Sequence, residues 1–276
     1  MTNRWFNGVA IVALTAVGTV AAQAADLPTR KEAPAPVFVP PPFTWTGFYV
    51  GVNVGGAWTS GNRSAQIFAP AAFPFPVSTF FPGSFGSGQS GVIGGGQAGY
   101  NWQTGSFVLG VETDFDGTSL SKTFDATGVP FSGAGVPAFL LGDTLSVHAK
   151  TSLDWLGSTR GRVGWVPFPD NRWLIYGTGG VAYGGGSANF TVFDATQNLL
   201  LTGNPSSSRV GWVAGGGVEY ALTNNWTIKA EYLYYNLGKS TFSTAPAVLA
   251  GFTGVFANGQ VDYRVQTVRA GVNYKF

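Results

Sequence analysis

The chain has 276 residues, no cysteine and one histidine, and its 15 basic and 13 acidic residues leave a formal net charge of +2. This near neutrality argues against a nucleic-acid-binding surface, and the lack of cysteine excludes disulfides, thiolate catalysts and thiolate metal ligands. Charged residues make up 10% of the chain, against about 25% in ordinary soluble domains.

The first 24 residues predict a cleaved secretory signal. Arg4 is followed by an apolar run from Val9 to Val20, and "AQA" then provides a small-x-small cleavage site. A retained membrane helix is the alternative, but the run is shorter than the roughly 18–20 apolar residues that spanning requires. Residues 25–44, "ADLPTRKEAPAPVFVPPPFT", hold six prolines and predict an extended periplasmic spacer.

Eight segments with a period-2 alternation follow, and each predicts a two-faced β-strand. No run after the signal is long enough for a transmembrane helix, so an exported and largely apolar chain of this kind favours a closed β-barrel. The segments are Trp45–Thr59, Gly91–Gln103, Ser106–Asp116, Val147–Trp165, Arg172–Gly184, Arg209–Ala221, Trp226–Leu237 and Val261–Phe276.

The connections alternate strictly between short and long. "QTGS", "VPFPDN" and "LTNN" are tight turns by composition, whereas the gaps at 60–90, 117–146, 185–208 and 238–260 are long. The pattern predicts an all-β fold over residues 45–276, an eight-stranded antiparallel transmembrane up-and-down β-barrel with short periplasmic turns and long extracellular loops. A soluble β-sandwich is the alternative, and an eight-stranded lipocalin would need the reverse distribution of polar and apolar faces.

Aromatic residues on the apolar parity recur about one bilayer apart. Phe48 and Trp58, for example, are separated by ten residues, as are Trp155 and Trp165. Ten steps of about 3.3 Å at a tilt near 40° rise about 25 Å, the height of the apolar band in outer-membrane barrels. The predicted girdles comprise Phe48, Trp58, Trp102, Phe107, Trp155, Trp165, Trp173, Tyr183, Trp212, Tyr220, Trp226, Tyr234, Tyr274 and Phe276.

The opposite parity collects charged side chains. Eight strands leave a lumen that side chains just fill, so acidic and basic groups on this face are forced close together. Paired, they would plug the barrel; a narrow, charge-lined ion path is the alternative. The predicted lumen charges are Glu112, Asp114, Asp154, Arg160, Arg162, Arg209, Glu219, Lys229, Glu231, Arg269 and Lys275.

Catalysis would have to use His148, with Ser146 or Ser152 as nucleophile and Asp143 as the carboxylate. Both serines share the parity of His148, which places all three side chains on the nominal inward face. Ser/Thr-rich strand ends are ordinary in barrels of this kind, so the chain is not expected to be an enzyme. One histidine and no cysteine give no support for a metal site, and no cofactor is expected.

The first long connection, "GNRSAQIFAPAAFPFPVSTFFPGSFGSGQSG", holds six phenylalanines and almost no charge. An exposed apolar region of this size is a candidate contact surface for an extracellular ligand. The alternative is that the rings pack on the loop itself, on the barrel rim or on lipopolysaccharide.

The motifs "GGGQAGYNWQ", "WLGSTRGRVGW", "RWLIYGTGGVAYG", "GWVAGGGVEYALTNNWTIKAEYLYYNLG" and "VRAGVNYKF" carry a family likeness. From about Trp45 onwards the chain resembles the small outer-membrane β-barrel family of alphaproteobacteria, within the OmpA-like and opacity-like barrels. The resemblance implies an outer-membrane location, in contact with lipid and lipopolysaccharide. It also implies that the last strand, with Val272, Tyr274 and Phe276, is a recognition signal for the barrel assembly machinery.

The expected function is a structural and surface role in the outer membrane with a charge-plugged lumen. One alternative is a narrow porin that passes small ions or solutes. The other is a surface receptor or adhesin that acts through the Phe-rich first loop.

Overall fold

The computed structural model describes residues 43–60, 63–68, 88–130, 144–194, 196, 199–203, 206–244, 247–249 and 252–276. All of them belong to the unit Pro42–Phe276. The expected signal, the spacer up to Pro42 and most of the Phe-rich loop lie outside the described residues. Within the described part of the chain, no helix is long and apolar enough to cross a membrane.

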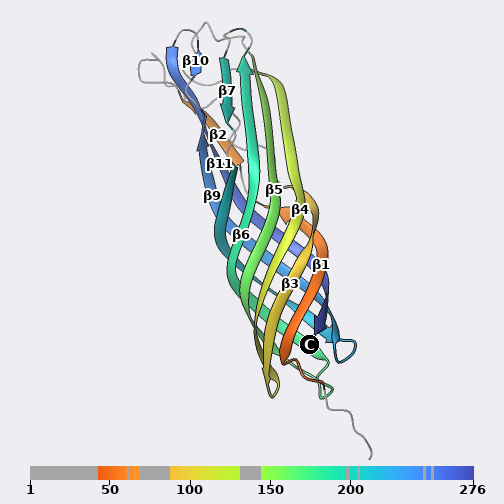
Figure 1. Cartoon of the computed structure of the whole chain (residues 1–276). Helices are drawn as coiled ribbons and strands as arrows, with labels where there is room; N and C mark the ends of the chain where they lie inside the picture. Colours follow the sequence, from red (N-terminus) through yellow and green to blue (C-terminus); the bar gives the residue numbers. More distant parts are fainter. Residues whose placement is uncertain are drawn as a thin grey trace, which may run out of the picture. The chain divides into compact units, whose positions relative to one another are not determined.

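Eight long antiparallel strands form the body of this unit, and each pairs with the next long strand along the chain (Figure 1). β1 also pairs with β11 from Tyr49 to Thr59, so the sheet closes on itself. The closed ring confirms the expected eight-stranded antiparallel barrel. The long strands are β1 (Gly47–Thr59), β3 (Ser90–Thr104), β4 (Phe107–Pro130), β5 (Thr144–Trp165), β6 (Trp173–Asp194), β8 (Ser206–Ala221), β9 (Trp226–Ser243) and β11 (Phe252–Lys275).

Three tight turns close one end of the ring, which we call the turn end. Gly105, with a φ of 59°, lies between β3 and β4, and Asn171, with a φ of 56°, precedes β6. Before β9, the backbone N–H of Leu222 donates to the carbonyl oxygen of Trp226 (2.9 Å). The start of β1 and the end of β11 lie side by side at this same end (Figure 1).

The opposite end, which we call the loop end, carries three short strands. β2 (Arg63–Phe68) and β10 (Ala247–Leu249) pair with β11, and β7 (Leu199–Gly203) pairs with β6. Several long strands also extend further here than expected, since β4 continues to Pro130 and β6 to Asp194. The Ser/Thr-rich stretches expected to be loops therefore continue the sheet, because Thr and Phe fit a pleated, half-buried surface.

Side chains alternate across the barrel wall. On β1, Phe48, Val52 and Val54 point outward and are 66%, 65% and 59% exposed, whereas Tyr49 and Asn53 point inward and are buried. In the middle of the barrel, the outer face is thus apolar and the inner face polar. This distribution is the reverse of the one that a lipocalin needs.

The interior is divided into three layers along the barrel axis. On β4, the buried inward residues run from Val108 near the turn end, through Glu112 and Asp116, to Leu120 towards the loop end. The charged side chains form the middle layer, which we call the ionic layer. The turn-end layer comprises Phe43, Trp45, Val108, Val166, Leu174, Tyr176 and Ala221, and the loop-end layer comprises Ala57, Ile93, Leu120, Leu153, Leu156, Ala182, Val213, Leu233, Tyr235, Leu237 and Val265.

Candidate functional site

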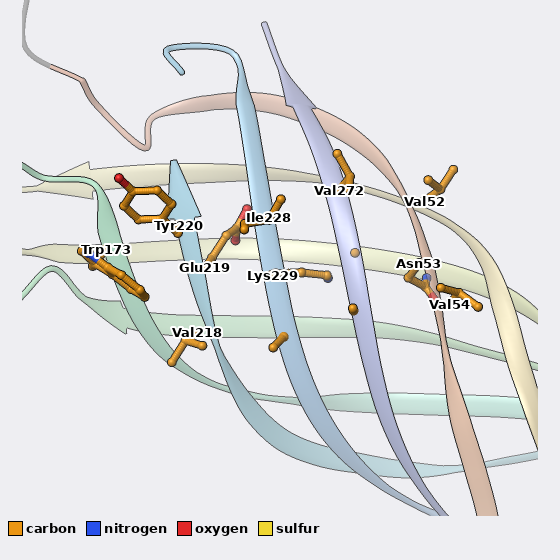
Figure 2. A pocket seen from close by; sticks show the side chains of 13 residues that line it. Val52, Asn53, Val54, Trp173, Val218, Glu219, Tyr220, Ile228, Lys229 and Val272 are labelled. Carbon is orange, nitrogen blue, oxygen red and sulfur yellow. The ribbon is translucent and has the colours of Figure 1, made fainter. Parts of the chain in front are cut away.

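A hollow on the outer surface crosses β1, β11, β9, β8 and β6 (Figure 2). Its walls are outward apolar side chains such as Val54 and Val218, and two small residues, Ala230 and Ala270, also line it. The charged groups of the strands that it crosses turn to the other side of the wall, where Lys229 contacts Glu112. The hollow therefore offers apolar contact but no chemistry, and the candidate functional site lies in the interior.

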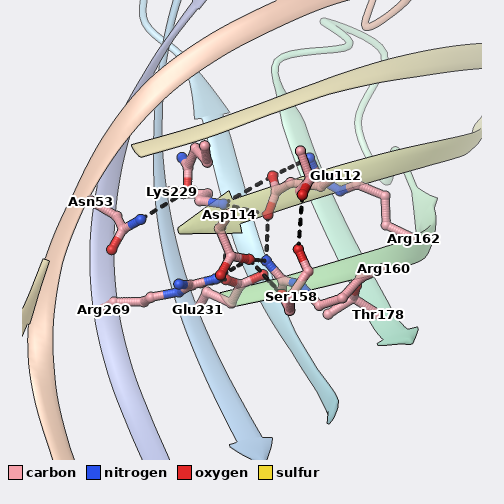
Figure 3. A network of polar contacts seen from close by, with 12 residues as sticks. Asn53, Glu112, Asp114, Ser158, Arg160, Arg162, Thr178, Lys229, Glu231 and Arg269 are labelled. Carbon is pink, nitrogen blue, oxygen red and sulfur yellow. Dashed lines mark hydrogen bonds and ion pairs between the residues drawn. The ribbon is translucent and has the colours of Figure 1, made fainter. Parts of the chain in front are cut away.

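The ionic layer arises from strand alternation on five strands of the ring, β4, β5, β8, β9 and β11 (Figure 3). Inward positions two residues apart place several charged side chains at one level of each strand. Cross-strand pairing then brings opposite charges together, because Glu112 lies opposite Arg160 and Glu231 lies opposite Arg269. Its charged members in the described chain are Glu112, Asp114, Asp116, Arg160, Arg162, Glu219, Lys229, Glu231 and Arg269.

Arg160 is the first hub of the layer. Its Nη2 lies 2.6 Å from Oε1 of Glu112 and 2.8 Å from Oδ2 of Asp114, and its Nη1 lies 2.9 Å from Oε1 of Glu231. One guanidinium from β5 therefore joins carboxylates from β4 and from β9, across the lumen. Charge-assisted hydrogen bonds of this length are the stronger class of hydrogen bond in proteins.

Arg269 on β11 is the second hub. Its Nη1 lies 2.6 Å from Oδ2 of Asp116, and its Nη2 lies 3.1 Å from Oδ2 of Asp114 and 2.9 Å from Oε2 of Glu231. Asp114 and Glu231 are thus shared between the two hubs. The sharing links four strands into one network, so a change at either arginine affects both.

Two further cations complete the layer towards the turn end. Nζ of Lys229 lies 2.9 Å from Oε1 of Glu112, and Nη2 of Arg162 lies 2.8 Å from Oε2 of Glu219. The guanidinium carbon of Arg162 also lies 3.9 Å from the ring centroid of Tyr176, in cation–π geometry. Arg162 therefore connects the ionic layer to the turn-end layer, of which Tyr176 is a member.

Neutral donors also bind the carboxylates, although Oδ1 of Asp114 is buried without a hydrogen-bond partner among the described residues. The described layer holds five carboxylates and four cations, which leaves one negative charge in excess. Hydroxyl and amide donors surround each carboxylate and help to offset that excess. The donated bonds are Tyr49 to Glu112 (2.7 Å), Ser158 to Asp114 (2.6 Å), Asn53 to Asp116 (2.9 Å), Thr227 and Asn273 to Glu219 (2.5 and 2.8 Å) and Tyr176 to Glu231 (3.1 Å).

Three of the predicted lumen charges lie elsewhere. Asp154 is exposed. Arg209 lies over the ring of Tyr263, with 4.3 Å to the centroid, near the loop-end layer. Lys275 lies at the turn end, where its Nζ donates to the carbonyl oxygen of Thr44 (2.7 Å). The other eight predicted charges meet in the ionic layer.

The displacement of Asp154 has a local cause in β5. The register between β5 and β6 shifts between Thr151 and Trp155, which marks a β-bulge. On the loop-end side of the bulge, odd-numbered residues face the interior in place of even-numbered ones. Leu153 is therefore buried and Asp154 is exposed. Simple alternation counted from Arg160 ignores the bulge. It therefore assigns the residues between the bulge and the loop end of β5 to the wrong face.

Asp116 is the member of the ionic layer that the sequence reasoning missed. It is fully buried and contacts Arg269. Its parity is that of Glu112 and Asp114, so alternation alone could have identified it. Asp116 is the last residue of the predicted strand, whereas β4 continues to Pro130 and keeps this side chain inside the barrel.

The bulge also turns His148, the residue considered for catalysis, away from the interior. His148 is 60% exposed on the outer face of the loop end, where its Nδ1 contacts the carboxylate of Asp125 on β4. Asp143 lies outside the described residues. The Ser152 hydroxyl pairs with that of Ser187 (3.1 Å). Among the described contacts, neither Ser146 nor Ser152 hydrogen-bonds to the imidazole.

The predicted girdle residues gather at two levels of the outer face. One level lies at the turn end, where Trp173 and Tyr220 are in contact with 4.7 Å between ring centroids. The other, which we call the upper level, lies nearer the loop end, where the ring centroids of Trp212 and Tyr234 are 5.5 Å apart. The turn-end level holds Phe48, Trp102, Phe107, Trp165, Trp173, Tyr220, Trp226, Tyr274 and Phe276, and the upper level holds Trp58, Trp155, Tyr183, Trp212 and Tyr234.

Val272 and Tyr274 near the end of β11, and Phe276 just after it, face outward. Val272 is 40% exposed and the terminal Phe276 is 70% exposed. The ring of Tyr274 lies between those of Trp226 and Phe276, with centroid distances of 5.1 and 5.2 Å. The three residues expected to form an assembly signal are therefore on one outer face.

Comparison with known proteins gives matches over nearly the whole chain. Residues 10–276 match the outer membrane protein beta-barrel domain. The 31 kDa outer-membrane immunogenic protein of Brucella melitensis biotype 1 is 34% identical over 279 residues, which cover 98% of this chain and 100% of that protein. The 22 kDa outer membrane protein of Rhizobium leguminosarum bv. viciae is 30% identical over 248 residues, or 89% and 83%. Among solved structures, OprG of Pseudomonas aeruginosa aligns with a TM-score of 0.43 and 15% identity over 85% of this chain and 98% of that chain.

Proposed function

The chain belongs to the outer membrane protein β-barrel family, and from this membership we propose that it serves a structural and surface role with a lumen plugged by the ionic layer. The outer membrane is its location, with the turn end towards the periplasm and the loop end outside. The girdle residues then lie at the two interfaces and contact lipid and lipopolysaccharide.

The observation that carries this proposal is the position of the ionic layer between two apolar layers. Every charged member of the ionic layer is at most 4% exposed. The turn-end layer separates it from the periplasm, and the loop-end layer separates it from the outside. An ion that crossed the barrel would have to pass both apolar layers and break charge-assisted bonds between them.

A narrow porin is the alternative, and the same groups would then set its ion selectivity. The close pairing at Arg160 and Arg269 argues against it, because each guanidinium contacts three carboxylates and each residue is only 1% exposed. The receptor or adhesin alternative rests on the Phe-rich loop, most of which lies outside the described residues, so a ligand there stays a prediction.

Two further roles belong to the same proposal. The outward group of Val272, Tyr274 and Phe276 supports recognition by the barrel assembly machinery. Normal outer-membrane levels of the protein after deletion of Phe276 would argue against that role.

We also propose that the protein is not an enzyme, because in the described contacts His148 is paired with Asp125 and not with a serine hydroxyl. Unchanged lipid A and surface peptides in a His148→Ala strain would agree with this.

The test of a plugged lumen is single-channel recording of the refolded protein in a planar bilayer. Heat-modifiable gel migration serves as the control that the barrel has folded. We expect no discrete openings, because the ionic layer is sealed on both sides. Reproducible, ion-selective openings from the same folded sample would favour the porin and reject the plugged lumen.

A further inference from the structure

The segment Phe43–Thr46 precedes β1 and enters the mouth of the barrel at the turn end. Trp45 is only 1% exposed, although it lies outside any strand, and the ring of Phe43 meets it edge to face with 5.0 Å between centroids. The expected boundary between spacer and barrel, at residues 44 and 45, falls inside this segment. The apolar walls that receive the two rings form what we call the turn-end cup, made of Val108, Val166, Leu174, Tyr176 and Ala221.

The rim of the turn-end cup holds the segment by specific polar contacts. The backbone N–H of Trp45 donates to Oε1 of Gln103 (2.8 Å), and its indole N–H donates to the carbonyl oxygen of Asn171 (2.9 Å). Nζ of Lys275 donates to the carbonyl oxygens of Thr44 (2.7 Å) and Thr46 (3.2 Å). A second bond, from Nε2 of Gln103 to the carbonyl oxygen of Gly105 (2.9 Å), fixes the orientation of the Gln103 amide. The rim therefore forms hydrogen bonds with the backbone of an extended segment and with one indole N–H.

None of these contacts belongs to the strand ladder. Residues 43–46 have no strand assignment, and the first pairs of β1 begin at Gly47. Removing the segment from the cup would therefore break no pairing of the eight-stranded ring. A segment held in this way opens at a lower free energy than the barrel that holds it.

Polar atoms without a protein partner lie directly behind the cup. Among the described residues, Oδ1 of Asn101 and Nε of Arg162 are buried and accept or donate no hydrogen bond. Arg162 lies over the ring of Tyr176, which is itself a wall of the cup. Water that entered a vacated cup would hydrate these atoms, which offsets part of the cost of exposing the apolar walls.

We propose that the turn-end cup is a binding site for an extended peptide bearing an aromatic residue, that Phe43–Thr46 is its intramolecular ligand, and that exchange of this ligand controls access of periplasmic water to the ionic layer. The proposal rests on the plugged lumen argued above. It adds a peptide site and a means of opening one of the two apolar layers.

The test uses a thiol reporter behind the cup, which the absence of cysteine makes specific. Asn101→Cys places one thiol on the inward face of β3, and its rate of reaction with a small cationic methanethiosulfonate is measured in the folded, full-length protein. We expect slow labelling when Trp45 is present. In the Asn101→Cys/Trp45→Ala protein, labelling should be faster on the order of tenfold or more, because the cup is open.

A synthetic peptide of residues 40–47, "PPPFTWTG", is then added to the Trp45→Ala protein. We expect it to restore slow labelling, whereas the same peptide with alanine in place of tryptophan should not. Trp102→Ala is the matched control, because Trp102 is adjacent to the reporter but is 63% exposed on the outer face. Gln103→Ala, which removes the acceptor for the Trp45 N–H, provides a second opened variant if Trp45→Ala does not fold.

Unchanged labelling in the folded Trp45→Ala and Gln103→Ala proteins would overturn control of access by the segment. Faster labelling that the peptide fails to slow would overturn the peptide site. The plugged lumen is judged separately, because openings recorded from the unmodified chain would reject it whatever the labelling rates.

Discussion

At the scale of single residues, Arg160 and Arg269 hold the interior together. Each guanidinium contacts three carboxylates from other strands, and both contact Asp114 and Glu231. Buried ion pairs of this kind add little net stability compared with an apolar core, but they are costly to break singly. We therefore expect the two arginines mainly to determine which side chains pair inside the barrel.

Replacing one hub tests this view. In Arg160→Met the carboxylates of Glu112, Asp114 and Glu231 lose a shared cation while they stay buried, and we expect the free energy of unfolding to fall by about 3–5 kcal/mol. The measurement is urea unfolding in lipid vesicles, followed by tryptophan fluorescence.

Arg264→Met is the matched control for this substitution. Arg264 also pairs with an aspartate, Asp262 (2.9 Å), but its side chain is 44% exposed. An exposed pair of this kind contributes about 0–1 kcal/mol, so the control should unfold almost as the parent does. Equal losses in the two variants would show that the buried network has no special role.

Residue positions in the interior follow from the sequence only where the strand is regular. Simple alternation placed Glu112, Asp114 and Arg160 on one face, and the structure brings them into contact. The same counting placed Asp154 with them, and that placement is wrong because one inserted residue in β5 reverses the parity. A bulge leaves little mark in a sequence, since any residue can occupy it.

At the scale of elements, the bulge in β5 lies where the polar and apolar faces of the strand exchange sides. On the turn-end side of it, β5 carries charges inward and apolar side chains outward. On the loop-end side the order is inverted, so that Val147 and Leu153 are buried inside and His148 is exposed outside. One strand thereby serves two surroundings, a bilayer and water.

Deleting Asp154 should remove the inserted residue without changing which side chains face inward. Regular alternation counted from Arg160 then places Leu153 and Val147 inward and His148 outward, as in the parent. We expect the ring to fold, with normal heat-modifiable migration, and the loop end to stay resistant to limited proteolysis on intact cells.

Asp154→Ala is the control for this deletion, because it removes the same carboxylate and keeps the residue count. It should resist protease as the parent does. Lower protease resistance of the deletion than of the substitution would contradict the assignment of Asp154 as the inserted residue of the bulge.

The strand ends show a second limit of sequence reasoning. The eight strands and their order could be predicted, but β4 and β6 were expected to end at Asp116 and Gly184. Their continuations are rich in Ser, Thr and Gly, which are typical of loops in water. They form strands because neighbouring strands at the loop end provide hydrogen-bonding partners and a shared apolar interior. Both are tertiary effects.

At the scale of the whole barrel, strand length gives its height. β4 and β11 each have 24 residues, which at about 3.3 Å per residue and a tilt near 40° rise about 60 Å. The apolar band of an outer-membrane barrel is only about 25 Å tall. Because the turn end closes with short turns, most of the remainder lies outside the cell.

Atomic force microscopy of the protein in supported bilayers can measure this asymmetry. We expect particles of one orientation to stand about 35 Å above the lipid and particles of the other to be almost flush with it, from the strand lengths and the height of the apolar band. Equal heights on the two faces would be incompatible with the long strands extending on one side.

The inverted faces of the loop end also bear on how such a sequence can change over time. Outside the membrane, alternate residues such as Thr123, Asp125, His148 and Lys150 point into water and carry no part of the interior. Substitutions there leave the apolar interior and the ladder intact, so the exposed lattice of side chains can diverge at every second position without loss of the fold. The barrel can thus present a rigid exposed surface whose side chains change while the fold is kept.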